Sequence, residues 1–263
     1  MRGFLLFDID GVLRDVANSY RLAIQETVNH FCDWRPTLQD IDELKSEGCW
    51  NNDWEASQEM IRRFQAKKYM SSQTPQFEKI IQVFSSFYFG GDPNADNRHW
   101  KGFIKNEPLL VNRDFFTRLT LKGFAWGFIS GAEPPSAKFV LETRLGLQNP
   151  PLIAMGDAPD KPDPTGLLSM ATQLAGVPLG KGVPPITYLG DTVADVLTIQ
   201  QARKKVPNQI FTSLAVAPPH LHNQQDLEVR TKYESLLRKA GADRIVKNTE
   251  EVLTFLDKLE SSK

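Results

Sequence analysis

The chain has 263 residues, which is enough for one large domain or two smaller ones. Its hydrophobic content of 41% and charged content of 24% are ordinary for a soluble globular protein. A formal net charge of -1 gives no reason to expect nucleic acid or an anionic membrane as a partner.

The sequence also bears on the compartment. No apolar run approaches the ~20 residues that a membrane helix needs, and the first three residues run straight into an apolar strand, without room for a signal peptide. The only two cysteines, Cys32 and Cys49, are too few for a disulfide scaffold and fit a reducing environment. We therefore expect a cytoplasmic protein.

The most informative stretch is residues 4–13, which read FLLFDIDGVL. The apolar run at 4–7 predicts a strand buried on both faces, as in a parallel sheet flanked by helices. Asp8 and Asp10 then follow the carboxyl end of the strand, where such sheets bind ligands. Two acids this close repel each other unless a cation or a shared proton offsets their charge. The alternative is a solvated turn rich in aspartate.

The chain after this stretch changes to helical periodicity. Apolar residues recur at helical spacing in four segments: 19–31, 38–44, 56–64 and 77–89. A break rich in asparagine and tryptophan separates the second from the third, and a loop rich in glycine, proline and asparagine follows at 90–97. We expect residues 16–104 to form a small helical domain inserted after the first strand.

The remaining chain alternates strands with helices. We expect strands at 124–129, 151–155, 186–189 and 214–216. We expect helices at 113–121, 134–145, 165–175, after 191–195, at 227–240, and at the C-terminus, where residues 249–251 cap the last one. This alternation predicts an α/β core with one Rossmann-like parallel sheet, made of residues 1–15 and 105–263.

Polar side chains follow the ends of four of these strands. They are Asp8 and Asp10, then Ser130, Lys161, and finally Asp191 and Asp195. If the strands are parallel neighbours, these groups converge on one edge of the sheet. Phosphoryl transfer needs such a set: a carboxylate nucleophile, a second acid for proton transfer, a hydroxyl and a lysine to hold phosphate oxygens, and carboxylates for Mg²⁺.

Four short motifs in this order resemble those of the haloacid dehalogenase (HAD) superfamily. The sequence DIDGVL at residues 8–13 is similar to its hDxDGx(V/T)L signature, and Ser130-Gly131 to its second motif. KPDP at 161–164 is similar to the third motif and GDTVAD at 190–195 to the fourth. The helical insert resembles the C1 cap of subfamily IA members such as phosphoglycolate phosphatases and β-phosphoglucomutases. The stretch at 51–54 is similar to a cyanobacterial subfamily of these phosphatases.

This resemblance implies roles for the acidic residues. Asp8 would be the nucleophile and a Mg²⁺ ligand. Asp10 would be the general acid and base, with its backbone carbonyl also on Mg²⁺. Asp191 would bind the metal, and Asp195 would bind it or support its waters. The competing interpretation of Asp195 is a purely structural carboxylate that bonds to a neighbouring loop.

The same resemblance implies that Ser130, Gly131 and Lys161 hold the phosphoryl group. Two of these residues have an ordinary alternative: Ser130 could simply cap a helix, and Lys161 could be a surface lysine. Asp10 favours a phosphatase or phosphomutase over a dehalogenase, because an alkoxide leaving group needs a proton and halide does not.

We therefore expect Mg²⁺-dependent hydrolysis of a small phosphorylated metabolite, a phosphate monoester, through an aspartyl-phosphate. The alternatives are a phosphomutase of the β-phosphoglucomutase type and a non-catalytic binding protein on the same scaffold. Asn51 and Asn52 are candidates to read the substrate, although they could equally form a packed corner. Arg14 and Asp15 either touch the substrate or are solvated hinge residues. The chain could be a monomer or a homodimer.

Overall fold

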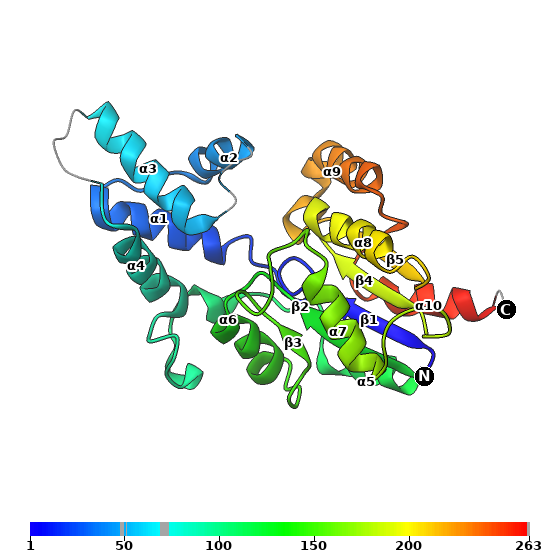
Figure 1. Cartoon of the computed structure of the whole chain (residues 1–263). Coiled ribbons are helices and arrows are strands. Elements are labelled where there is room, and N and C mark those ends of the chain that lie inside the picture. The colour runs from blue at the N-terminus through cyan, green and yellow to red at the C-terminus, as the bar shows by residue number, and fades with distance from the viewer. Residues whose placement is uncertain (48–49, 51, 69–73, 262–263) are drawn as a thin grey trace. The chain divides into compact units, whose positions relative to one another are not determined.

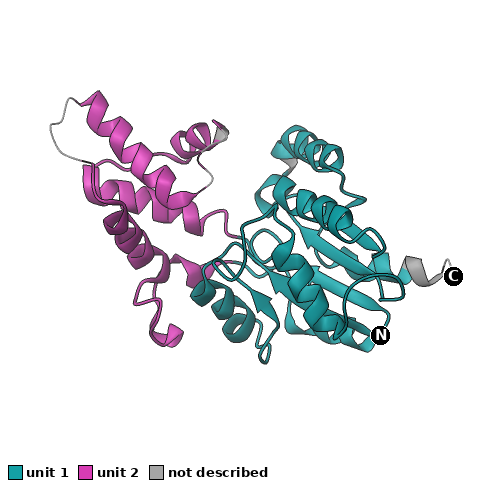
Figure 2. Cartoon of the chain, viewed as in Figure 1, with its two compact units in different colours: residues 1–15, 108–263 teal, residues 16–107 magenta. Residues whose placement is uncertain are grey.

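The structure, a computed structural model, describes residues 1–47, 50, 52–68 and 74–261. The chain forms two compact units: residues 1–15 with 108–263, and residues 16–107 (Figure 2). The second boundary lies at 107/108 rather than at the expected 104/105. The reason is Glu107, whose buried carboxylate accepts hydrogen bonds from Ser19 and Tyr88 and so belongs to the helical unit.

The first unit is built on one six-stranded parallel sheet with the strand order β3-β2-β1-β4-β5-β6 (Figure 1). Its strands are β1 (Gly3–Phe7), β2 (Phe124–Ile129), β3 (Leu152–Ile153), β4 (Ile186–Gly190), β5 (Phe211–Val216) and β6 (Arg244–Val246). The predicted Rossmann-like parallel core is thereby confirmed. The direction in which successive strands are added to the sheet reverses between β1 and β4. These two strands are neighbours in the sheet, although residues 8–185 lie between them in the sequence.

Helices cover both faces of this sheet. They are α5 (Arg113–Leu121), α6 (Pro134–Lys138), η3 (Phe139–Arg144), α7 (Thr165–Ala175), α8 (Val193–Lys205), α9 (Leu227–Ala240) and α10 (Glu251–Ser261), with the short 3₁₀ turns η4 (Pro219–His222) and η5 (Gln224–Asp226).

The residues of β1 show why this strand lies at the centre. Leu5 and Phe7 pack into one hydrophobic cluster with α5, α6, η3 and α10. Phe4 and Leu6, which point the other way, pack into a second cluster with α7 and α8. All four side chains are buried, and full burial of each contributes about 1.5–3 kcal/mol. An apolar residue at every position is what a strand covered on both faces requires.

The second unit consists of helices packed on one another. They are α1 (Ser19–Cys32), α2 (Leu38–Ser46), α3 (Asp53–Lys67), α4 (Phe77–Phe89), η1 (Asn97–His99) and η2 (Phe103–Asn106). Thr37 and Asp40 form a capping box at the start of α2. Tyr20 of α1 stacks on Tyr88 of α4, with ring centroids 4.7 Å apart.

Three local predictions need correction. The helix expected over 134–145 is α-helical only to Lys138 and continues as a π-helical turn, in which the Leu145 N–H bonds to the Val140 carbonyl. The strand expected at 151–155 has only two residues, because the Ala154 N–H donates to the side chain of Asp157. Thr249 does not cap α10, since its hydroxyl donates to the Val12 carbonyl, 2.5 Å away.

Among the described residues, no helix is both long enough and apolar enough to cross a membrane.

The junction between β4 and α8 yields a test of the fold. A Cβ at Gly190 would lie 2.2 Å from the Cβ of Asp195, a distance that forces the backbone to shift. We expect Gly190→Ala to lower the free energy of unfolding by roughly 1–3 kcal/mol, as overpacking does elsewhere. Gly131→Ala is the matched control, because nothing lies within 4 Å of its added Cβ. Denaturant unfolding compares the two variants, and equal stability would contradict this packing.

Candidate active site

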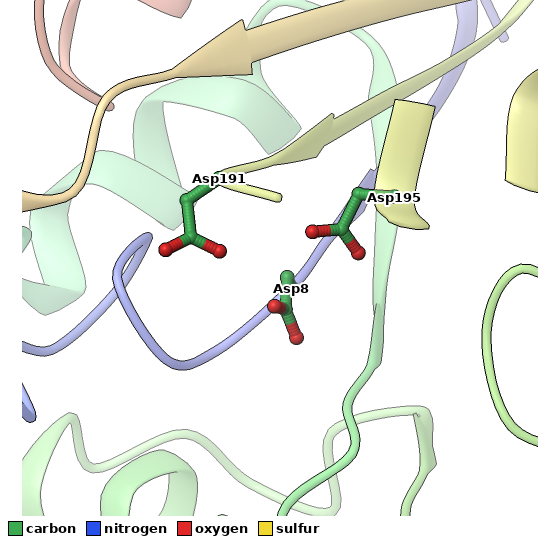
Figure 3. Close-up of side chains that lie close together, drawn as sticks. All are labelled: Asp8, Asp191 and Asp195. Atoms are coloured by element: carbon green, nitrogen blue, oxygen red, sulfur yellow. The ribbon is translucent and has the colours of Figure 1, made fainter. Parts of the chain in front are cut away.

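Three buried carboxylates gather at the carboxyl end of the sheet. Asp8 follows β1, Asp191 follows β4, and Asp195 lies in the first turn of α8; each offers an oxygen within 4.8 Å of the others (Figure 3). The parallel pairing of β1 with β4 places Phe7 beside Leu189, and the Asp8 N–H bonds to the Leu189 carbonyl. Adjacent strands that end at the same level therefore bring Asp8 and Asp191 together.

Gly11 makes this close approach possible. Its φ of +73° lies in the left-handed region, which L residues with a side chain seldom adopt. A Cβ at Gly11 would also lie 2.0 Å from Oδ2 of Asp191. The glycine of the first motif is thus required both for the turn and for the space that Asp191 occupies.

Lys161, from the loop between β3 and α7, is the cation of the group. Its Nζ lies 2.6 Å from Oδ1 of Asp195 and 3.2 Å from Oδ1 of Asp8. It also donates to the hydroxyl of Tyr188, 3.2 Å away. Burial by itself lowers the pKa of Lys161, but Asp195 and Asp8 outweigh burial and raise it well above its ordinary range. The two carboxylates therefore favour the charged form of Lys161.

Hydrogen bonds hold Asp195 on both of its oxygens. Oδ1 accepts from Lys161 and from the Tyr188 hydroxyl, and Oδ2 accepts from the N–H and the hydroxyl of Thr192. Thr192 and Asp195 together form the capping box of α8. Burial raises the pKa of Asp195, but Lys161 and these hydrogen bonds outweigh it and lower the pKa. Asp195 is a fixed anion that orients Lys161.

Asp8 has a different environment, although its side chain is also buried. Its Oδ1 accepts no hydrogen bond among the described residues, because Lys161 is at ion-pair distance but outside hydrogen-bond geometry. Burial, then the charges of Asp195 and Asp10, raise the pKa of Asp8 from 3.8 to about 7, although Lys161 opposes this shift. Burial and the carboxylates of Asp195 and Asp8 likewise raise the pKa of Asp191 well above its ordinary range.

These observations test whether the residues fit the expected Mg²⁺. A hard divalent cation takes carboxylate oxygens as ligands, and its charge offsets the repulsion between them. Asp8 and Asp191 offer such oxygens, buried and close together, and Oδ1 of Asp8 has no hydrogen-bond donor among the described residues. The pair fits a divalent cation, whereas both oxygens of Asp195 already accept hydrogen bonds.

The Asp10 carboxylate lies outside the cluster that Asp8, Asp191 and Asp195 form. Its side chain is 25% exposed, and its Oδ1 accepts a hydrogen bond from Nε of Arg14 at 2.6 Å. Arg14 is completely buried, so of its two interpretations the solvated hinge residue is excluded.

Ser130, Gly131 and Lys161 line one small pocket, which brings together the three residues expected to hold phosphate. Ser130 directly follows β2, and its hydroxyl accepts the N–H of Ala132 at 3.1 Å. Its side chain is therefore held toward the turn that precedes α6, whose own N-cap position is Glu133.

The structure describes only one of the two asparagines that were expected to contact the substrate. Asn51 lies outside the described residues. Asn52 is the N-cap of α3, and its side-chain oxygen accepts the N–H groups of Trp54 and Glu55. This capping bond explains why an asparagine stands there, and a role in substrate recognition stays a prediction.

Sequence reasoning missed Tyr188 as a buried partner of the site, and it did not predict that Arg14 is buried and paired with Asp10. Tyr188 lies in the middle of β4, where apolar residues predominate, and its hydroxyl contacts both Lys161 and Asp195. A phenol inside an otherwise buried strand is a signal, because a buried hydroxyl needs a partner. Arg14 carried no comparable signal, since an arginine next to an acidic loop is usually solvated.

The fold and site together define a class of protein, an α/β protein with an acidic centre at the carboxyl edge of a parallel sheet. A family model described as a haloacid dehalogenase-like hydrolase matches residues 4–203. The chain therefore belongs to the haloacid dehalogenase-like hydrolases, and the resemblance noted in the sequence is confirmed.

Solved structures with the same fold have low sequence identity to this chain. A predicted phosphoglycolate phosphatase from Haemophilus somnus is 14% identical, with a TM-score of 0.65 over 96% of this chain and 97% of its own. A phosphatase from Thermococcus thioreducens is 22% identical, with a TM-score of 0.59 over 89% and 99% of the two chains. CbbY from Rhodobacter sphaeroides, solved with phosphate, is 17% identical, with a TM-score of 0.61 over 96% of each chain.

A curated protein from Phytophthora nicotianae, named imidazoleglycerol-phosphate dehydratase, is 31% identical over 204 residues. The match covers 75% of this chain but only 41% of that protein, so this chain spans about two fifths of its relative. The dehydratase name belongs to the longer protein.

The raised pKa of Asp8 predicts how metal-free stability depends on pH. The folded protein keeps the Asp8 proton up to about pH 7, whereas the unfolded chain releases it near 3.8. The folded state thus binds more protons in this window, and the Asp8 contribution to stability is lost as pH rises through it. We expect Mg²⁺ to raise the melting temperature by several degrees more at about pH 8 than at about pH 5.

Thermal unfolding with Mg²⁺ and with a chelator, at both pH values, makes the measurement. Asp8→Asn should remove most of the pH dependence of the Mg²⁺ effect. Asp114→Asn, which changes an exposed carboxylate on α5, should keep it. An equal Mg²⁺ effect at both pH values in the wild type would contradict this assignment.

Proposed function

We propose that the protein is a Mg²⁺-dependent phosphatase that hydrolyses a small organic phosphate monoester through an aspartyl-phosphate on Asp8. One observation carries the proposal: Oδ1 of Asp8 is buried, accepts no hydrogen bond among the described residues and lies 3.2 Å from Nζ of Lys161, and an Asp8 oxygen lies within 4.8 Å of an Asp191 oxygen. A carboxylate oxygen without a donor keeps its lone pairs for a phosphorus atom and for a cation.

In the first step, an Asp8 oxygen attacks the phosphorus atom and the bond from phosphorus to the ester oxygen breaks. The leaving oxygen takes the electron pair of that bond together with a proton from Asp10. The alcohol departs, and the phosphoryl group is held on Asp8 as an acyl phosphate. Asp10 suits this role because it is two residues from Asp8 and partly exposed.

In the second step, water attacks the phosphorus atom and gives a proton to Asp10, which is now a carboxylate. The bond from phosphorus to the Asp8 oxygen breaks, and phosphate leaves. Asp8 returns as a carboxylate and Asp10 returns in its protonated form. The sum of both steps is one ester and one water converted to one alcohol and one phosphate.

Other groups of the site hold the phosphoryl oxygens. We assign this role to the Lys161 ammonium, the Ser130 hydroxyl and the Gly131 N–H, which share one pocket. When bound by Asp8, Asp191 and the Asp10 carbonyl, Mg²⁺ supplies positive charge that offsets the negative charge of the phosphoryl group. Asp195 keeps Lys161 in place through the 2.6 Å ion pair, which favours a supporting role over direct ligation.

The identity of the alcohol portion of the substrate depends on residues other than these. We propose that the helical unit, residues 16–107, acts as a C1-type cap and supplies them, with Asn51 and Asn52 as first candidates. The short side chains of asparagine donate and accept hydrogen bonds, which suits the hydroxyl groups of a phosphorylated metabolite.

The variant Asp8→Asn tests the nucleophile. Its amide oxygen is a far weaker nucleophile than a carboxylate, so we expect turnover to fall by at least about a thousandfold. The melting temperature of the metal-free protein should not fall, because the substitution removes one of three crowded acids. Asp114→Asn is the control and should keep wild-type turnover. Wild-type-like turnover in Asp8→Asn would contradict the mechanism.

A substrate screen tests the activity itself. Purified protein is incubated with phosphoglycolate, sugar phosphates and nucleotides, and free phosphate is measured with Mg²⁺, with a chelator, and after Mg²⁺ is restored. We expect release from at least one monoester, loss on chelation, and recovery with Mg²⁺. Isomerised sugar phosphate that forms only with a bisphosphate activator would instead indicate a phosphomutase. No release from any monoester would sink the proposal.

A further inference from the structure

Arg14 is the largest fully buried side chain of the described residues, with 0% of its surface exposed. It lies directly after the first motif, at the end of the loop that carries Asp10. Burying a guanidinium costs several kcal/mol unless hydrogen-bonded partners compensate it. Arg14 is completely buried beside the partly exposed Asp10, so its burial needs an explanation.

The contacts of Arg14 connect two parts of the proposed site. Its Nε donates to Oδ1 of Asp10 at 2.6 Å, and its Nη2 donates to the hydroxyl of Ser136 at 2.8 Å. Ser136 is buried in α6, the helix that follows the Ser130-Gly131 turn. The guanidinium thus joins the acid of the first motif to the helix behind the second motif.

The backbone strengthens this connection. The Gly11 N–H donates to the Arg14 carbonyl at 2.9 Å, and the Arg14 N–H donates to the Ile9 carbonyl at 3.2 Å. The loop from 9 to 14 is therefore closed on itself, with Asp10 inside it. A planar guanidinium holds its partners in one orientation, which a flexible ammonium does not.

We propose that Arg14 is a positioning residue that holds the Asp10 carboxyl group in the orientation needed for proton transfer to the leaving oxygen. This inference rests on the proposed function, in which Asp10 is the general acid. Asp10 is partly exposed and could rotate toward solvent, and the paired guanidinium prevents that rotation. Ser136 in turn fixes the guanidinium from the side of α6.

This role has a chemical signature that a merely structural role lacks. When the ester bond breaks, the electron pair stays on the leaving oxygen. An alkoxide needs a proton at that moment, whereas p-nitrophenolate is a stable anion and leaves without one. A misplaced Asp10 therefore slows the first step, which kcat/KM reports, more for alkyl phosphates than for p-nitrophenyl phosphate, whereas the second step is the same for both. Loss of folding or of phosphate binding slows both alike.

The experiment measures kcat and KM with saturating Mg²⁺ on two substrates, p-nitrophenyl phosphate and the best alkyl phosphate of the screen. The variants are Arg14→Met, Arg14→Lys and Ser136→Ala, with Asp10→Asn as the benchmark. Arg113→Met, which changes an exposed arginine at the start of α5, is the matched control. Melting temperatures verify that each variant is folded.

We expect Arg14→Met to lower kcat/KM on the alkyl phosphate at least about tenfold more than on the aryl phosphate, with the same selectivity as Asp10→Asn. Adding Arg14→Met to Asp10→Asn should leave this selectivity unchanged, because the group it positions is already gone. Arg14→Lys should restore part of the alkyl activity, and Ser136→Ala should shift selectivity in the same direction but less.

A fall in kcat/KM that is equal on the two substrates would overturn the positioning role. If Arg14→Met does not fold, Arg14→Lys and Ser136→Ala decide the question by the same ratio. If the wild type releases phosphate from neither substrate, the proposed function is overturned instead. The two failures are therefore distinguishable.

Discussion

Repulsion among buried carboxylates is the constraint on which the rest of this structure depends. Asp8, Asp191 and Asp195 approach within 4.8 Å, and Lys161 is the cation that contacts two of them. Leaving such charges uncompensated costs several kcal/mol each. The fold maintains the arrangement nevertheless, through the parallel register of β1 with β4 and the space left by Gly11. A bound cation would offset the repulsion between these carboxylates, which is why we propose a metal at Asp8 and Asp191.

The same residue type has different properties here because hydrogen bonding differs. Four donors surround the two oxygens of Asp195, which lowers its pKa and fixes it as the partner of Lys161. Oδ1 of Asp8 has no such donor among the described residues, and burial raises its pKa to about 7. Both oxygens of Asp195 accept hydrogen bonds, so this carboxylate positions Lys161. Oδ1 of Asp8 is left to attack a phosphorus atom in the proposed mechanism. This contrast underlies the roles that we propose.

Much of this could be predicted from the sequence, because short-range patterns determine it. The apolar run before Asp8 predicted a doubly covered central strand, and polar residues at strand ends predicted the group that includes Asp191 and Lys161. What could not be predicted depends on distant partners. The Thr249 hydroxyl bonds to Val12 rather than capping its own helix, and Arg14 is buried because Ser136, 122 residues later, lies beside it. No local pattern encodes such contacts.

The most direct test of the central claim is to locate the divalent ion. Crystals grown with Mn²⁺ in place of Mg²⁺ would reveal the ion by its anomalous scattering. We expect one strong peak in coordination contact with carboxylate oxygens of both Asp8 and Asp191, and none in crystals of Asp191→Asn. A peak elsewhere, or no peak in wild-type crystals at saturating Mn²⁺, would contradict the account.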